Sequence, residues 1–198
     1  PGVGVGTAHY SFSATGSLVY VLGDAKAGQR RLVWVDRKGA ETPLAAPASM
    51  YANPRFSPDG RRIAVSTGLP GTPILLYDLS RETLTRFTFE GNLNQFPTWT
   101  PDGKRIAFDS NLQGPAVNLF WQLADGSGGL ERLATSEFSN WPTSWSPDGQ
   151  LLAYVEGNPT TAWDLWVLRM SDRKTQPFLR TPANEGGPRF SPDGRWIV

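Results

Sequence analysis

FSPDG, at residues 56–60, occurs four times along the chain in recognisable form. The other three copies are WTPDG at 99–103, WSPDG at 145–149 and FSPDG at 190–194, and a degenerate copy, FSATG, lies at 12–16. Successive copies begin 43 to 46 residues apart, since they start at residues 12, 56, 99, 145 and 190. A near-constant period of this length indicates a repeat architecture.

Each copy has the residue preferences of a tight β-turn. Ser57, Pro58 and Gly60 occupy the first, second and fourth positions of a type I turn, where these residues are favoured. Asp59 can accept hydrogen bonds from nearby backbone N–H groups. An apolar run follows every copy: RRIAVS (61–66), KRIAFD (104–109), QLLAYV (150–155) and RWIV (195–198). Each copy therefore predicts a β-hairpin with a glycine bulge.

The composition excludes several classes of protein. The 198 residues include 21 Gly and 17 Pro and show no long helical pattern, which favours an all-β fold with many turns. With 19 basic and 18 acidic residues the net charge is +1, so neither nucleic acid nor an anionic membrane is an expected partner. The absence of cysteine excludes disulfides and thiolate sites. No apolar run approaches the ~20 residues of a membrane span, so direct membrane insertion is not expected.

The repeats predict the domain organisation. Four short strands fit into each repeat, and the repeats run over about 9–52, 53–96, 97–141 and 142–187, with a partial copy at 188–198. Four antiparallel strands in a repeat of about 40–45 residues are typical of a β-propeller blade. We therefore expect one β-propeller segment of four blades plus the first hairpin of a fifth, as a fragment of a propeller of about six to eight blades. A β-sandwich is the main competitor, but it requires no four-stranded unit of constant length.

The terminal residues lead to an expectation about the whole protein. The start, PGVGVGTA, lacks the basic and apolar regions of a signal peptide. The chain has no initiator Met and stops at Val198, within an expected strand. We therefore expect the sequence to be a piece of a longer protein.

The motif P-x-[FW]-S-P-D-G-x-x-[IL]-A-[FY] resembles the blades of TolB-like, WD-repeat-like β-propellers. Residues 97–108 and 188–198 carry it plainly, and the copy at 54–65 ends in Val. The stretches 32–44, 84–91, 96–103, 142–149 and 180–196 are similar to propeller regions attached to bacterial receptor-like serine/threonine protein kinases. The resemblance implies a periplasmic or extracytoplasmic location. It carries over no catalytic residue, because the kinase motifs lie outside these residues.

The residues give weak support for catalysis or metal binding. His9 is the one histidine, and no G-x-S-x-G motif accompanies it, so a packed or surface role is favoured over a triad base. GVGVG at 2–6 lacks the spacing of a phosphate loop. The repeated Asp residues lie one to a blade, so they favour a role in the turn over calcium binding. We expect no enzyme activity, no metal and no cofactor.

The candidate ligand site lies in the loops between blades. These loops join the outer strand of one blade to the inner strand of the next, and in a propeller they gather around the axis on one face. Polar and aromatic groups that converge from several elements are typical of a binding site, although the same residues could serve the crossover turns. The candidates are Tyr51, Asn53, Asn92, Asn94, Gln95, Glu137, Asn140, Trp141, Trp163, Asn184 and Glu185.

Two main hypotheses for function follow. The first is a non-enzymatic binding and scaffolding propeller for a protein or peptide, the sensing part of a larger bacterial protein such as a receptor-like kinase or a TolB-like envelope protein. The second is the substrate-gating propeller of a prolyl oligopeptidase-like serine peptidase whose catalytic domain lies outside this segment. Exposed blade faces would also allow self-association.

Overall fold

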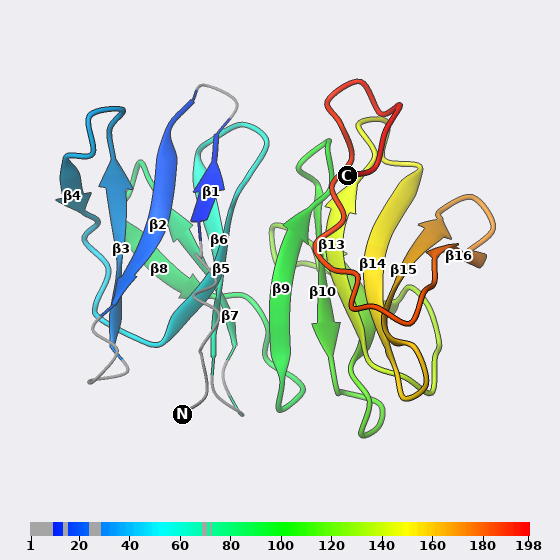
Figure 1. The fold of residues 1–198 in the computed structure, drawn as a ribbon. Helices are drawn as coiled ribbons and strands as arrows, with labels where there is room; N and C mark the ends of the chain where they lie inside the picture. The colour runs from blue at the N-terminus through cyan, green and yellow to red at the C-terminus, as the bar shows by residue number, and fades with distance from the viewer. Residues whose placement is uncertain (1–9, 14–15, 24–28, 69–70, 72) are drawn as a thin grey trace, which may run out of the picture.

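The computed structural model describes residues 10–13, 16–23, 29–68, 71 and 73–198, and its strands form four antiparallel sheets of four strands each (Figure 1). Within every sheet, strands that are adjacent in the sequence are also hydrogen-bonded neighbours. The predicted all-β architecture of four-stranded antiparallel blades is thereby confirmed. His9 and the GVGVG stretch lie outside the described residues.

The sixteen strands of the described residues follow the chain in order. They are β1 (Tyr10–Phe12), β2 (Leu18–Gly23), β3 (Arg30–Val35), β4 (Glu41–Pro43), β5 (Tyr51–Phe56), β6 (Arg62–Thr67), β7 (Ile74–Asp78), β8 (Thr83–Arg86), β9 (Asn94–Trp99), β10 (Arg105–Ser110), β11 (Asn118–Leu123), β12 (Glu131–Arg132), β13 (Asn140–Trp145), β14 (Leu151–Asn158), β15 (Ala162–Arg169) and β16 (Thr175–Leu179).

The sheets pack face to face in sequence order around the strands β1, β5, β9 and β13. Each of β5, β9 and β13 contacts the first three strands of the preceding sheet. The core lies between the sheets: Ile106 and Phe108 on β10 pack with Ala64 and Leu76 of the second sheet. Ala107, between them in sequence, packs with Leu152 of the fourth sheet. Alternate residues of one strand therefore serve two interfaces, as expected where both faces of a sheet are covered.

The SPDG turns (residues 57–60, 100–103, 146–149 and 191–194) have the predicted hairpin geometry. In the first, the Ser57 hydroxyl donates to Asp59 Oδ1 at 2.6 Å and accepts from Arg62 N at 2.9 Å. Gly60 has a φ of 68°, in the left-handed region that favours glycine. The same carboxylate accepts from Arg61 N, so Asp59 has the structural role that the sequence predicted.

The turns also contact one another from blade to blade. A Cβ built on Gly103 would lie 3.6 Å from Cδ of Pro58, and one on Gly149 would lie 3.6 Å from Cδ of Pro101. Proline in one turn therefore packs on glycine in the next.

The outermost strands β4, β8 and β12 are short, with 3, 4 and 2 residues. Beyond β8 and β12 the chain buries an apolar side chain. Phe87 and Leu133, each 2% exposed, follow β8 and β12 in this way. Both backbone N–H groups still donate to the neighbouring strand, Phe87 to Ile74 O at 2.9 Å and Leu133 to Leu119 O at 2.8 Å.

The partial fifth repeat forms a hairpin. Phe190 and Ile197 make an antiparallel bridge, and Arg189 and Val198 exchange two backbone hydrogen bonds. The innermost strands β5, β9 and β13 begin at Tyr51, Asn94 and Asn140, so the predicted repeat boundaries fall inside them.

Candidate functional site: an axial cavity

A cavity of about 1070 Å³ lies between the innermost strands of all four sheets. We call this space the axial cavity. Residues of β1, β5, β9 and β13 line it, and residues 186–189 close one side. Since every sheet contributes to its wall, only the assembled fold creates this site.

Bulges in the innermost strands turn side chains toward the cavity. The register of β5 against β6 shifts between Ala52 and Arg55, and the enclosed Asn53 has a φ of 52°. The pairing of β9 with β10 shifts in the same way, and Phe96 has a φ of 49°. A positive φ is strained for a bulky residue, and bulges of this kind are common beside binding sites. Asn53, Gln95 and Phe96 all line the cavity as a result.

Two tryptophans form an aromatic wall at one end of the cavity. The rings of Trp141 on β13 and Trp163 on β15 have centroids 6.1 Å apart and a 57° interplanar angle. Gly157 lies against Trp141, since a Cβ at that position would be 3.0 Å from Cη2 of the indole. Trp163 is 51% exposed, although it is a large apolar side chain. An exposed aromatic pair beside a cavity is a common anchor for a ligand.

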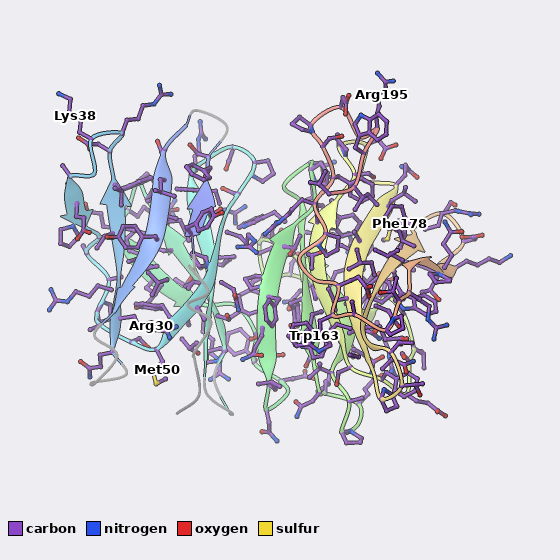
Figure 2. The ribbon with its side chains drawn as sticks, in the orientation of Figure 1. Arg30, Lys38, Met50, Trp163, Phe178 and Arg195 are labelled. Carbon is purple, nitrogen blue, oxygen red and sulfur yellow. The ribbon has the colours of Figure 1, made fainter. Side chains whose placement is uncertain are left out.

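The aromatic wall lies at the end of the propeller away from the SPDG turns. Figure 2 shows Arg30, Met50 and Trp163 in the lower half of the view, whereas Arg195, in the last SPDG turn, lies at the top. Arg30 and Met50 also line the cavity, and Nη1 of Arg30 donates to Tyr51 O at 3.0 Å. The connections between successive sheets therefore lie on the same face of the propeller as the part of the cavity that Arg30, Met50 and Trp163 line.

Two arginines that sequence reasoning missed also line the cavity. Arg55 and Arg189 each occupy the variable position of a Pro-x-Phe-Ser-Pro-Asp-Gly copy, so the repeat itself could have indicated them. Burial, with the nearby charge of Arg189 as a second cause, lowers the pKa of Arg55 to about 10. Burial likewise lowers the pKa of Arg189. Arg55 is half-buried, whereas Arg189 is exposed, so incomplete solvation applies chiefly to Arg55.

The structure brings only some of the predicted site residues together. Asn53, Gln95, Trp141 and Trp163 line the axial cavity. Of the others, Tyr51, Asn94 and Asn140 are buried, whereas Asn92, Glu137 and Asn184 are exposed on the loops and Glu185 is half-buried.

The predicted site residues that are buried mostly form hydrogen bonds with backbone atoms. The Tyr51 hydroxyl donates to Pro47 O at 2.7 Å, and Nδ2 of Asn94 donates to Glu90 O at 3.0 Å. Glu185 accepts from the Thr181 hydroxyl, and its backbone N–H donates to Trp163 O at 3.0 Å. Such bonds fix the crossover connections that hold the cavity open.

Several carboxyl groups are buried outside the cavity. Burial raises the pKa of Asp109 on β10 to about 8. Burial also raises the pKa of Glu156, which accepts from the Ser136 hydroxyl at 2.9 Å. Asp164 pairs with Arg180 at 3.2 Å and accepts from the Thr161 hydroxyl. Among the described residues, no three His, Asp or Glu side chains are placed to hold a metal ion.

The described residues contain no helix with the length and hydropathy that a membrane crossing requires.

A protein-family model described as the TolB beta propeller domain matches residues 7–198. A curated relative, an uncharacterized protein of Agrobacterium fabrum, is 31% identical over 75 residues, which cover 38% of this chain and 25% of that protein.

Solved structures share the fold at low sequence identity. TolB from Acinetobacter baumannii matches with a TM-score of 0.79 and 22% identity over 96% of this chain and 47% of TolB. A prolyl endopeptidase matches with a TM-score of 0.61 and 15% identity over 93% of this chain and 31% of that enzyme. At these identities the likeness concerns the fold alone. The chain spans a quarter to a half of the length of the relative and of the TolB structure described here.

Proposed function

Because the chain belongs to the TolB β-propeller family, we propose that it is a non-enzymatic binding module that holds a protein or peptide segment in its axial cavity. The supporting observation is the cavity itself, which has about 1070 Å³ and receives side chains from all four sheets. A volume of this size accommodates several residues of an extended segment, and cavities with apolar walls and a few polar groups are typical ligand sites.

The walls suit a peptide with an aromatic or aliphatic anchor. Trp141 and Trp163 offer apolar surface on one side, while Gln95 on β9 and Asn53 on β5, whose Nδ2 donates to Ser66 Oγ at 3.3 Å, add amide groups to the wall. Amide side chains can pair with both the N–H and the C=O of an extended backbone. The tryptophans would bind an apolar side chain and the amide groups would hydrogen-bond to the peptide backbone, as in other peptide-binding grooves.

The double variant Trp141→Ala/Trp163→Ala tests this proposal. Peptides would be selected on the wild-type chain from a random peptide display library, and their affinities measured by titration calorimetry. We expect the double variant to bind the selected peptides at least about tenfold more weakly, because truncation of an aromatic anchor typically costs more than 1 kcal/mol.

Trp196→Ala is the matched control, since Trp196 is 64% exposed and lies outside the cavity wall. It should leave peptide affinity unchanged. Failure of the wild-type chain to select any peptide, or equal affinities for the double variant and the wild type, would contradict the proposed function.

We also propose that the propeller is the sensing part of a larger extracytoplasmic protein, with a receptor-like serine/threonine kinase as the first candidate. The support is the resemblance of the stretches 32–44, 84–91 and 180–196 to kinase-attached propellers. The complete reading frame tests the proposal. A kinase domain and a membrane helix before the propeller are expected, whereas a hydrolase domain with a G-x-S-x-G motif would indicate the gating propeller of a peptidase instead.

A further inference from the structure

Among the described residues, the walls of the axial cavity carry basic groups and no acidic ones. Arg30, Arg55 and Arg189 are among the lining residues, and none of the lining residues is Asp or Glu. The chain as a whole is nearly neutral, with 19 basic and 18 acidic residues. The cavity is therefore positively charged, although the molecule as a whole is nearly neutral. Apolar walls strengthen the electric field of such charges.

Arg55 and Arg189 form a pair of like charges. Both donate hydrogen bonds to backbone oxygens: Nη1 of Arg55 donates to Pro54 O at 2.9 Å, and Nη1 of Arg189 donates to Thr143 O at 2.9 Å. Both side chains line the same cavity, and the charge of Arg189 contributes to the lowered pKa of Arg55. A longer contact of 3.5 Å joins Arg55 Nη1 to Tyr10 O on β1, in the neighbouring first sheet.

Neither arginine has a carboxylate partner in the described part of the chain. The four ion pairs found there use Arg169, Arg173, Lys174 and Arg180. Nε of Arg55 is buried and has no acceptor. A buried N–H donor of a charged group without an acceptor destabilises the protein, so an anion at this place would recover that free energy.

The repeat shows that the two arginines are not required by the blade. The equivalent positions of the third and fourth repeats hold Thr98 and Ser144, and those blades form the same turn. The Ser144 hydroxyl even accepts from Phe190 N at 3.1 Å, a backbone contact that Arg55 and Arg189 cannot make with their side chains. Small polar residues therefore suffice structurally, and the arginines add charge to the cavity.

We propose that the arginine pair binds a carboxylate of the peptide held in the axial cavity, so that the module selects acidic segments. The inference rests on the proposed function and specifies the class of its ligand. Guanidinium groups bind carboxylates through two parallel N–H···O bonds, and two such groups can share one carboxylate or hold two adjacent ones. Trp141 and Trp163, which line the same cavity, would then hold an apolar residue of the same segment.

The test compares peptide selections on three proteins. Random peptide display on the wild-type chain should enrich Glu and Asp, and the double variant Arg55→Gln/Arg189→Gln should lose this enrichment. For a selected acidic peptide we expect at least about a tenfold loss of affinity in the double variant, and little loss for its Gln-substituted form. The control Arg81→Gln/Arg195→Gln removes the same charge from exposed positions outside the cavity wall and should behave as the wild type.

Two further measurements keep the test decisive. The variant Arg55→Lys/Arg189→Lys retains the charge but loses the paired N–H geometry, and it should show intermediate affinity and a wild-type melting temperature. Acetate should compete with the acidic peptide, whereas stronger competition by inorganic phosphate would overturn the carboxylate assignment in favour of a phosphate ligand.

The possible failures are distinct. Peptides selected without acidic enrichment, or an equal loss in the control and the test variant, would overturn this inference and leave the binding module in place. A wild-type chain that selects no peptide would overturn both proposals.

Discussion

A single buried carboxyl group, Asp109 on β10, shows how far one residue can depart from its ordinary chemistry. Its side chain is 0% exposed and neither carboxyl oxygen has a hydrogen-bond partner. Burial therefore raises its pKa to about 8. No sequence pattern indicates this burial, because KRIAFD is an alternating strand pattern in which Asp109 could equally face solvent.

Asp109 should make the chain less stable as the pH rises. In the unfolded chain the group ionises near pH 4, whereas in the folded chain it holds its proton to about pH 8. Between these values the native state binds more protons, so the free energy of unfolding falls by about 1.4 kcal/mol per pH unit. Asp109→Asn should remove this slope and be more stable than the wild type at pH 8, as measured by urea unfolding between pH 5 and pH 8.

Glu137→Gln is the control for this prediction, since Glu137 is exposed. It should keep the wild-type dependence on pH. An Asp109→Asn variant whose stability falls with pH as steeply as that of the wild type would show that Asp109 is not the group responsible.

At the scale of the element, the aromatic residue that opens each FSPDG-type copy joins neighbouring sheets. Trp34 on β3 stacks on Phe56 with centroids 5.5 Å apart, and Trp121 on β11 stacks on Trp145 at 6.2 Å. The guanidinium of Arg105 lies 4.4 Å from the centre of the Trp121 ring. These stacks explain the aromatic residue before the turn in the copies that begin at Phe56 and Trp145.

Trp145→Ala should strongly destabilise the contact between the third and fourth sheets. The residue is 8% exposed, stacks on Trp121 and donates from Nε1 to Thr98 O at 3.4 Å. We expect a loss of about 3–5 kcal/mol in the free energy of unfolding, as is usual for truncation of a buried Trp. The control Trp196→Ala, at a 64% exposed position, should lower the free energy of unfolding by less than about 1 kcal/mol. Equal losses for the two variants in urea unfolding would show that Trp145 does not stabilise the contact between the sheets.

At the scale of the whole molecule, the four sheets form an open arc. No described strand of the first sheet contacts a strand of the fourth. Large apolar side chains are exposed on both of these sheets, with Phe12 at 61% on β1 and Phe178 at 52% on β16. Exposed apolar surface at the ends of a stacked arrangement favours association with another surface of the same kind.

We therefore expect the isolated chain to self-associate in solution. Size-exclusion chromatography with light scattering should show a mass that rises with protein concentration, and Phe12→Ser/Phe178→Ser should shift the population toward the monomer. Arg81→Gln, at an exposed position, should have no effect. A monomeric wild type at every concentration would show that the arc is stable without a partner.

The sequence by itself determined the blade. The FSPDG period predicted the turns, the four strands of each sheet, the partial fifth hairpin and the structural role of the repeated Asp, because all of these depend on contacts within one repeat or between equivalent positions. It also placed Asn53, Gln95, Trp141 and Trp163 in the candidate site, and these four line the cavity.

Only the tertiary structure decided which loop residues share a site. Tyr51 and Asn140 belong to the same sequence segments as Asn53 and Trp141, yet they are buried, because adjacent residues of a strand face opposite sides and a bulge reverses the alternation. Arg55 and Arg189 lie far apart in the sequence, and stacking of the sheets around one axis brings them to the same cavity. The repeat motif alone cannot predict that two arginines line one cavity, because their proximity depends on how many blades separate the two positions.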